Sequence, residues 1–269
     1  MRIGQMGFGK TGKAVANVLL ESEKCSLEWV LRKSHRLEHR SVAEFLGVDT
    51  ELPGHIHATD EFSPAELLDR YPVDIIVDFS SPQGIHYYGD EARKRGIIII
   101  SAVSEYPAET NKYLRELAQD TVVIHSPNIT LGINFLLIAA KILQNIAPYT
   151  DVEIIEEHFK LKPEVSGTSR VIATGLGVDH ATIKSVRAGG IIGVHEILFG
   201  FPYQTVRLKH ESISREAFGN GVVFVVENLP VAKAGFFTME DLLLPHFKLD
   251  RTEADFAQQK QRPWWWLWK

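Results

Sequence analysis

Residues 2–12 read RIGQMGFGKTG and decide the fold of the N-terminal half of the chain. A short apolar strand runs directly into a GxGxxG pattern, and apolar residues then recur at helical spacing. The three glycines allow a tight strand-to-helix turn whose backbone N–H groups can approach a pyrophosphate. The pattern predicts dinucleotide binding, and the alternative is a turn that serves packing alone. The predicted cofactor contacts here are Gly7, Phe8, Gly9, Lys10, Thr11 and Gly12.

Up to about residue 127, short apolar strands alternate with amphipathic helices, which is the pattern of βαβ units around a parallel sheet. The expected strands are Arg2–Met6, Leu27–Leu31, Val73–Phe79, Ile97–Ala102 and Thr121–His125, and the expected helices are Lys10–Leu20, Pro82–Arg95 and Pro107–Ala118. The fold class is therefore α/β. We expect a Rossmann-like dinucleotide-binding domain over residues 1–127.

After Asn128 the pattern changes to one apolar helix, Leu131–Ile146, followed by a series of strands. The expected strands are Val152–Glu157, Ile183–Arg187, Val194–Phe199 and Thr205–His210, and a helix is expected at Ser214–Leu229 with Ser214 as N-cap, although Gly219 and Gly221 weaken it. This predicts an α+β substrate-binding and oligomerisation domain over 128–229. Residues 251–269 form a tryptophan-rich C-terminal extension, expected either to pack on a neighbouring subunit or to be disordered.

Composition excludes several classes of protein. The 269 residues carry a formal net charge of −5, which argues against a nucleic-acid partner. The longest apolar runs fall well short of the ~20 residues that cross a bilayer, so no membrane association is expected. The single cysteine, Cys25, cannot form an internal disulfide, and no secretory signal pattern is visible at the N-terminus. We expect a cytoplasmic protein.

The end of the second strand bears on cofactor choice. An NAD-type site would have an acidic residue there to bind the ribose hydroxyl, but the chain reads Leu31-Arg32-Lys33. Arg32 and Lys33, with Lys10 as a third cation, suit a 2′-phosphate, so NADPH is expected and NADH is the alternative. A solvated basic turn would explain the same residues.

Residues 156–168, EEHFKLKPEVSGT, combine the groups needed to reduce a small anionic substrate: cations, N–H donors at a helix start and a proton donor. His158 can supply a proton near neutral pH. Lys160 and Lys162 share one side if the segment is extended. A structural histidine would be expected from His158 alone, but its neighbours favour catalysis.

This segment resembles the signature of the 4-hydroxy-tetrahydrodipicolinate reductase family. Four further motifs of that family occur elsewhere in the chain, and all five stand in the family's order. They are Asp78–Pro82, similar to DF(S/T)xP; Ser126–Asn134, similar to (S/A)xNxSxGxN; Val186–His195, similar to RxGxxxGxH; and His210–Arg215, similar to HxAxSR. Together they span the chain up to about Leu244.

The resemblance implies a role for each matching residue. His158 would be the general acid and Lys162 a second catalytic cation, with Ser166, Gly167 and Thr168 holding a substrate carboxylate. Phe79, Ser80, Ala102 and Asn128 would line the cofactor groove. The family further implies a small anionic cyclic substrate, a homotetramer built through the second domain's sheet, and a last helix, Phe236–Leu244, that returns to the first domain, so that about 230–250 joins residues 1–127.

The departures from the family pattern keep other functions open. Phe159 stands where the family commonly has a second, substrate-contacting histidine, the loop before Ser166 is one residue shorter, and Ser101–Ser104 replaces a GTTG turn. A reductase of another cyclic imine or unsaturated acid is one alternative, and a non-catalytic dinucleotide-binding regulator is another. His195, His210 and Arg215 match family positions but could serve structure equally well. Glu153, Glu156 and Glu157 alternate between strand faces without metal-ligand spacing, so no metal is predicted.

Overall fold

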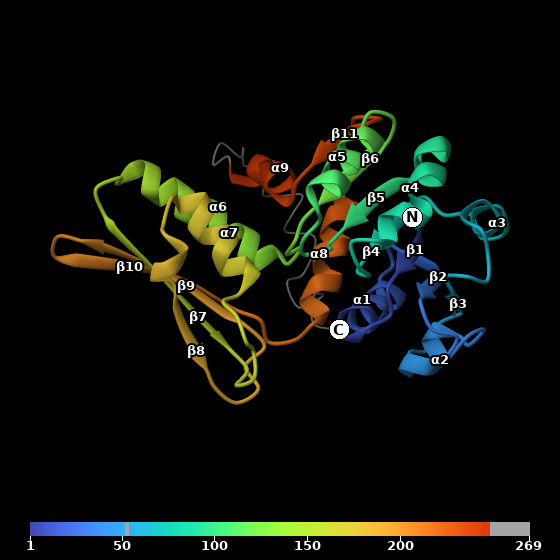
Figure 1. Ribbon diagram of the computed structural model, residues 1–269, viewed down its shortest axis with the longest axis horizontal. Helices are drawn as coiled ribbons and strands as arrows, with labels where there is room; N and C mark the ends of the chain where they lie inside the picture. The colour runs from blue at the N-terminus through green and yellow to red at the C-terminus, as the bar shows by residue number, and fades with distance from the viewer. Residues whose placement is uncertain (52–53, 248–269) are drawn as a thin grey trace, which may run out of the picture.

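The computed structural model describes residues 1–51 and 54–247 and has two lobes side by side (Figure 1). The first lobe is built on a seven-stranded sheet in the order β11-β6-β5-β4-β1-β2-β3, with every neighbouring pair parallel. The strands are β1 (Arg2–Met6), β2 (Ser26–Arg32), β3 (His55–Ala58), β4 (Ile75–Asp78), β5 (Ile98–Ser101), β6 (Val122–His125) and β11 (Gly235–Phe237). The strand order reverses between β1 and β4, and such a switch point opens a ligand crevice at the carboxyl ends of the strands.

Helices cover both faces of this sheet. The helices of one face are α1 (Lys10–Glu21), α2 (Val42–Leu46), α8 (Glu216–Glu227) and α9 (Met239–Leu243), and those of the other are α3 (Pro64–Arg70), α4 (Gly84–Arg95) and α5 (Ala108–Leu117). Each face buries its own apolar core, in which side chains such as Val15 and Tyr88 are almost completely shielded. The predicted Rossmann-like architecture is confirmed.

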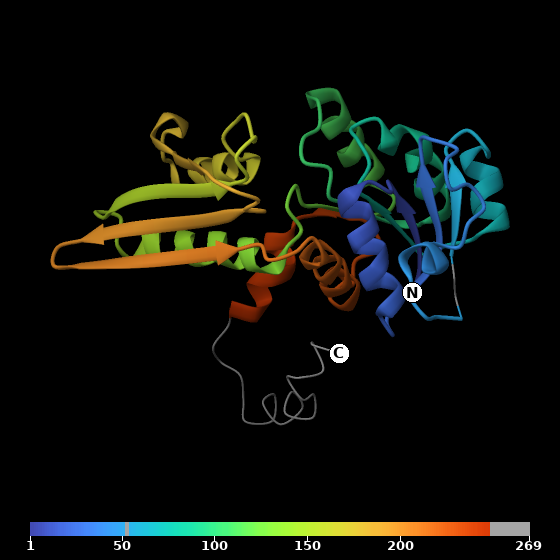
Figure 2. The ribbon, with the colours of Figure 1, turned by 90° about the horizontal axis from the view of Figure 1, so that it is seen from below.

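The second lobe is a mixed sheet in the order β10-β9-β7-β8, with helices on one face only (Figure 2). Its strands are β7 (Asp151–His158), β8 (Lys184–Arg187), β9 (Val194–Phe201) and β10 (Gln204–Glu211), its helices are α6 (Leu131–Ile146) and α7 (Gly167–Leu176), and a short 3-10 turn η1 (His180–Thr182) precedes β8. Ile154, Ile197 and Phe199 pack against α6 and α7 in a third core. The predicted α+β character of this half is confirmed.

Four elements of the first lobe were not predicted from the sequence: α2, β3, α3 and β11. Strand β3 has only four residues, two of them histidines, so no apolar run marks it. Helix α3 does carry a signal, because Ser63 and Glu66 form a reciprocal capping box with Pro64 in the first turn. The helix expected at Phe236–Leu244 is wrong for its first residues, which belong to β11 and pair with β6, so the chain returns to the first sheet as a strand. The helix itself is α9, and a 3-10 turn η2 (Leu244–Phe247) follows it.

Helix α8 begins later than predicted. Ser214 is not its N-cap; Arg215 occupies that position, because β10 runs on to Glu211 and Ser212 is still bonded to the carbonyl of Gly193 in the sheet. The two glycines of α8 have a packing reason. A Cβ on Gly219 would meet Val18 of α1 at 2.6 Å, and one on Gly221 would meet the Ile129 carbonyl at 2.0 Å.

The packing of α8 bears on the domain boundaries. This helix lies inside the predicted range 128–229, yet its buried residues belong to the core of the first sheet. The division at 127 and 229 stays a prediction. The C-terminal extension 251–269, with its tryptophans, lies outside the described residues. Within those residues, no helix combines the length and apolar character that a membrane crossing requires.

Candidate active site

A cavity of about 800 Å³ is lined by residues of both lobes. The first lobe contributes residues that follow β4, β5 and β6, together with Thr11 of α1. The second contributes the end of β7, the start of α7 and part of β9. Of the predicted site, the residues that line this cavity are Thr11, Phe79, Ser80, Ala102, Asn128, His158, Phe159, Lys162, Ser166, Gly167 and Thr168. The tertiary structure thus brings most of the predicted residues to one space.

In the glycine turn after β1, two glycines leave no room for a Cβ atom, and the third borders open space. Gly7 has φ +92°, and a Cβ there would meet the Phe79 carbonyl at 2.6 Å. A Cβ on Gly12 would lie 2.2 Å from the Gly7 carbonyl oxygen, whereas nothing lies within 4 Å of one on Gly9. Gln5 fastens the turn by donating from Nε2 to the carbonyls of Gly7 (2.9 Å) and Gly12 (2.8 Å).

The space beside Gly9 fits a pyrophosphate. Gly9 is the N-cap of α1, with no side-chain capping bond and no acidic residue in the first turn. The first N–H groups of the helix are therefore left for an anion, and the helix dipole favours negative charge there. Phe8 cannot contribute its ring, because that side chain is buried in the core against Phe45. Only its backbone could face a cofactor.

The basic pair lies elsewhere in the first lobe. Arg32 ends β2 and donates from Nη1 to the carbonyl of Arg36 at 2.7 Å, within the loop that follows the strand. Lys10 and Lys33 are exposed. Neither Arg32 nor Lys33 lines the cavity, so their predicted contact with the adenosine end of the cofactor stays a prediction.

The turn after β4 carries the next cavity residues. Asp78 is fully buried and accepts hydrogen bonds from Ser80 N (2.8 Å), Ser80 Oγ (2.6 Å) and the Tyr88 hydroxyl (3.0 Å). Burial raises the pKa of Asp78, and these hydrogen bonds oppose the rise. Asp78 therefore fixes the turn that presents Phe79 and Ser80 to the cavity.

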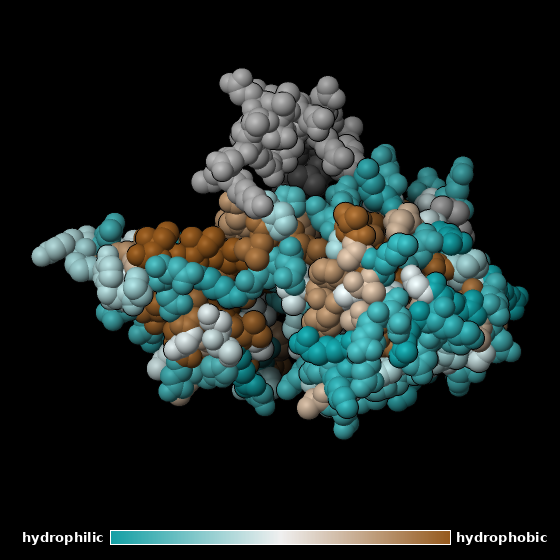
Figure 3. All heavy atoms as spheres, turned by 90° about the horizontal axis from the view of Figure 1, so that it is seen from above, coloured by the Kyte–Doolittle hydropathy of each residue, from teal (hydrophilic) through white to brown (hydrophobic). Residues whose placement is uncertain are grey.

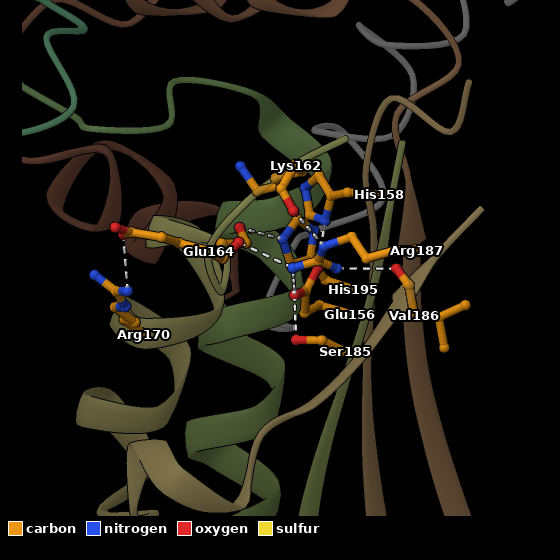
Figure 4. A network of polar contacts seen from close by, with 10 residues as sticks. Glu156, His158, Lys162, Glu164, Arg170, Ser185, Val186, Arg187 and His195 are labelled. Carbon is orange, nitrogen blue, oxygen red and sulfur yellow. Dashed lines mark hydrogen bonds and ion pairs between the residues drawn. The ribbon is translucent and has the colours of Figure 1, made fainter. Parts of the chain in front are cut away.

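His158 stands at the end of β7, in contact with a buried carboxylate. Its Nδ1 is bonded to Glu156 two residues earlier on the same strand face, and Arg187 donates to the other oxygen of Glu156 at 2.6 Å (Figure 4). Nε2 is the remaining ring nitrogen and lies 3.1 Å from the place a Cβ would take on Gly193, another cavity residue. Since Glu156 occupies Nδ1, Nε2 is the nitrogen left for proton transfer.

The charges in this network have defined physical causes. Burial disfavours the Glu156 carboxylate, but hydrogen bonds from Arg187, Ser185 and His158 outweigh burial and lower the pKa of Glu156 to about 2. Burial lowers the pKa of His158, while the hydrogen bond and charge of Glu156 raise it in part. The result is an ionised Glu156 beside an imidazole that gives up its proton readily.

Lys162 reaches the cavity through a turn rather than along an extended strand. β7 ends at His158, and Lys162 N bonds back to the Phe159 carbonyl at 3.0 Å. The segment is therefore not extended, so the condition under which Lys160 and Lys162 would share one side is not met, and of the two only Lys162 lines the cavity. Arg187 holds this short loop by donating to the carbonyls of Lys162 (3.0 Å) and Glu164 (2.9 Å).

The start of α7 forms an anion cradle facing the same cavity. Ser166 is the N-cap, but its hydroxyl pairs with His195 Nε2 at 3.1 Å instead of capping the helix, and no acidic residue lies in the first turn. The N–H groups at Gly167 and Thr168 are left for a carboxylate. Asn128 donates to Thr168 Oγ1 at 3.2 Å, which connects the cradle to the hinge between the lobes.

Some residues of the site were not singled out from sequence. Glu153, Glu156 and Glu157 were predicted only to project to alternating faces of a strand. This is confirmed, because Glu156 is fully buried whereas Glu153 and Glu157 are not. Its spacing of two from His158 on a strand was the available signal, since such residues share a face. Phe218 of α8 enters the cavity through packing that no local pattern shows. The sequence left open whether His195, His210 and Arg215 serve function or structure. His195 lines the cavity, but His210 and Arg215 do not.

Replacing Glu156 with Gln is expected to lower kcat about tenfold or more and to change its pH profile. Glu156 raises the pKa of His158, so its loss lowers that pKa further. The limb on which kcat falls with rising pH should move to lower pH. Glu157→Gln, on the opposite strand face, is the control. An unshifted limb in Glu156→Gln would contradict this role.

The buried histidines predict instability in acid. Burial and the neighbouring His158 and His210 lower the pKa of His195 to about 3. An unfolded chain takes up this proton below about pH 6.5, so the free energy of unfolding should decline from there towards pH 3, by up to about 1.4 kcal/mol per pH unit. Urea titrations across this range should show a shallower decline for His195→Gln than for wild type. The exposed His180→Gln variant should keep the wild-type slope.

The fold and cavity define a class of protein. A glycine turn at the switch point of a parallel sheet faces an imidazole, a lysine and an anion cradle on a second lobe, which is the arrangement of an oxidoreductase that uses a nicotinamide dinucleotide. Family models give the particular family. "Dihydrodipicolinate reductase, N-terminus" matches residues 1–129 and "Dihydrodipicolinate reductase, C-terminus" matches 128–243. The chain belongs to the dihydrodipicolinate reductase family.

Relatives agree with this assignment. The chain is 30% identical to the 4-hydroxy-tetrahydrodipicolinate reductase of Caldanaerobacter subterraneus over 63% of this chain and 76% of that protein. It is 29% identical to that of Dechloromonas aromatica over 90% and 97%. In fold it is similar to a dipicolinate-bound dihydrodipicolinate reductase from Paenisporosarcina sp. TG-14, with a TM-score of 0.73, 21% identity and coverage of 90% of this chain and 98% of the other.

Proposed function

We propose that the protein reduces 4-hydroxy-tetrahydrodipicolinate to tetrahydrodipicolinate, a step in the diaminopimelate route to lysine, in which one hydride and one proton are added and the 4-hydroxyl group leaves as water. The observation that carries this proposal is the pairing of His158 with buried Glu156 opposite the dinucleotide turn, in one cavity with Lys162 and the α7 cradle. A non-catalytic regulator would not need such a proton donor. The names of the relatives supply the substrate.

The chain's own residues would carry the following parts of the reaction. The reduced nicotinamide, when bound, supplies the hydride. The N–H groups of Gly167 and Thr168 hold a substrate carboxylate, and Lys162 neutralises charge beside it. His158 donates a proton from Nε2, and Glu156 keeps Nδ1 engaged and steadies the imidazolium. Because burial lowers the pKa of His158, the rate should fall as the pH rises above that value.

Phe159 favours a second candidate, reduction of a related cyclic imine or unsaturated acid. Its side chain lines the cavity and is 42% exposed, so it offers an apolar surface to a substrate. An analogue with fewer polar groups would suit this wall better than a fully polar one.

The two candidates are separated by one assay. NADPH oxidation is followed with enzymatically generated 4-hydroxy-tetrahydrodipicolinate and, in parallel, with a panel of cyclic imines that lack one carboxylate. Highest kcat/KM on the first substrate supports the main proposal. Higher kcat/KM on a panel member assigns the second, and binding of NADPH without any turnover overturns both.

The cofactor is proposed to be NADPH rather than NADH, on the basis of Arg32 and Lys33 at the end of β2. Arg32→Glu should raise the Kd of NADPH by at least about tenfold and leave NADH nearly unchanged, because only NADPH carries the 2′-phosphate. Fluorescence titration with both cofactors measures this. Lys112→Glu on α5, whose side chain is 80% exposed, is a matched control, and equal losses for both cofactors would refute the role of Arg32.

The assembly is proposed to be a cytoplasmic homotetramer formed through the second lobe. Within the described residues, no helix covers the outer face of its sheet, where Ile155 and Leu198 lie on neighbouring strands and Val186 is 44% exposed. Hydrophobic side chains also gather over α6 (Figure 3), including Phe135 and Ile146. Light scattering on the purified protein tests the tetramer.

A further inference from the structure

A second group of ligand-type side chains lies at the far edge of the first sheet. We call His39, His57 and Glu61 the edge cluster. His39 comes from the loop after β2, His57 from β3 and Glu61 from the turn that follows β3. One ligand atom from each lies within 4.8 Å of the others. None of the three lines the cavity between the lobes.

The cluster converges on one carboxylate. His57 Nδ1 lies 3.0 Å from one oxygen of Glu61, and His39 Nδ1 lies 3.7 Å from the other. Ligands bound at about 2.1 Å in a tetrahedral array are about 3.4 Å apart. The two observed distances bracket this value, so small side-chain rotations would place all three groups on one ion.

The backbone holds His39 in this position. His39 has φ +61° and Leu37 has φ +74°, a left-handed conformation that costs energy in residues other than glycine. The loop is fixed there by bonds to β3, from His39 N to the Ile56 carbonyl (2.7 Å) and from Ile56 N to the Arg40 carbonyl (3.0 Å). Strained backbone kept by surrounding contacts is a feature of functional sites.

The exposure of the ligands suits a bound cation. The His57 side chain is 3% exposed, so the protein holds this ligand in place. The His39 side chain is 66% exposed and leaves a path from solvent. Phe62 and Tyr71 pack against the His57 ring and restrict its rotation.

We propose that the edge cluster binds one divalent transition-metal cation of the zinc class. Two imidazoles and one carboxylate suit Zn²⁺, Co²⁺ or Ni²⁺ rather than Mg²⁺ or Ca²⁺, which prefer oxygen ligands. No metal was predicted from the sequence because no His or Cys at metal-ligand spacing accompanies the β7 carboxylates, and the ligands at 39, 57 and 61 have no recognisable spacing either. A bound ion would fasten the loop that carries Arg36, the partner of Arg32.

The experiment uses the full chain, stripped of metal and titrated with Zn²⁺ by calorimetry and with Co²⁺ by visible absorption. One Zn²⁺ per chain is expected, with a Co²⁺ spectrum of nitrogen and oxygen ligation and a raised Tm. His39→Gln and Glu61→Gln should weaken Zn²⁺ binding at least tenfold. His39 is exposed, so its variant should fold normally, which circular dichroism verifies. His35→Gln is the matched control, because His35 is 63% exposed in the same loop but contacts Glu38 and Asp60 instead.

Three outcomes would overturn the proposal. One is the absence of stoichiometric Zn²⁺ binding by the wild-type chain. Another is equal binding in the wild type and in both cluster variants. The third is a thiolate-to-Co²⁺ band, which would place the ion on Cys25. These readouts do not depend on reductase activity, so they stand whether or not the proposed function is correct.

Discussion

Replacing His158 with Gln is expected to lower kcat about 10²- to 10⁴-fold, the usual contribution of a positioned general acid. Glutamine can replace the hydrogen bond to Glu156 but cannot deliver a proton. The Kd of NADPH should stay unchanged, because His158 belongs to the second lobe while the glycine turn belongs to the first. Steady-state kinetics with saturating substrate and NADPH fluorescence titration give the two quantities.

The pH profile adds a readout that a structural defect would not produce. Wild type should lose activity as the pH rises through the pKa of His158, which lies below its ordinary value. The residual activity of His158→Gln should lack this limb. His180→Gln, on η1 outside the cavity, is the control. A His158→Gln enzyme with kcat within about threefold of wild type would remove His158 from the mechanism.

Alanine at Gly12 is expected to damage both folding and cofactor binding. Its Cβ would lie 2.2 Å from the Gly7 carbonyl oxygen and 2.9 Å from the Gly7 carbonyl carbon, which are backbone atoms that cannot turn away. The turn must open, and we expect the free energy of unfolding to fall by about 1–3 kcal/mol. NADPH affinity should fall at least about tenfold with it.

Alanine at Gly9 separates these two effects. Its Cβ would meet no protein atom within 4 Å, so stability should change by less than about 1 kcal/mol. The methyl group would nevertheless occupy the approach to the α1 N-terminus, and the Kd of NADPH should again rise at least about tenfold. Gly190→Ala, which also meets nothing within 4 Å, is the matched control. Unchanged NADPH binding in Gly9→Ala would place the pyrophosphate elsewhere.

The local patterns in the sequence were sufficient for five of the seven strands of the first sheet, β1, β2, β4, β5 and β6, and for part of the site. A strand, a glycine turn and a helix follow one another directly within residues 2–21, and each carries its own local signal, so the pattern predicts them. The same holds for the helix start at Ser166, where a small-residue turn leaves N–H groups unpaired. His158 and Lys162 could be predicted as catalytic residues because they lie in the same segment as that helix start.

Only the tertiary structure decided which distant residues meet. β3 and β11 have too few apolar residues to be recognised alone, and they are strands because the edges of the sheet supply their hydrogen-bond partners. Glu156 and His158 share one face of β7, but only the pairing of β8 with β7 brings Arg187 alongside to hold the charge of Glu156. The edge cluster likewise exists because β3 pairs with β2 and the loop between them folds back. Sequence patterns report short-range preferences, whereas contacts across strands depend on register and packing that no single segment contains.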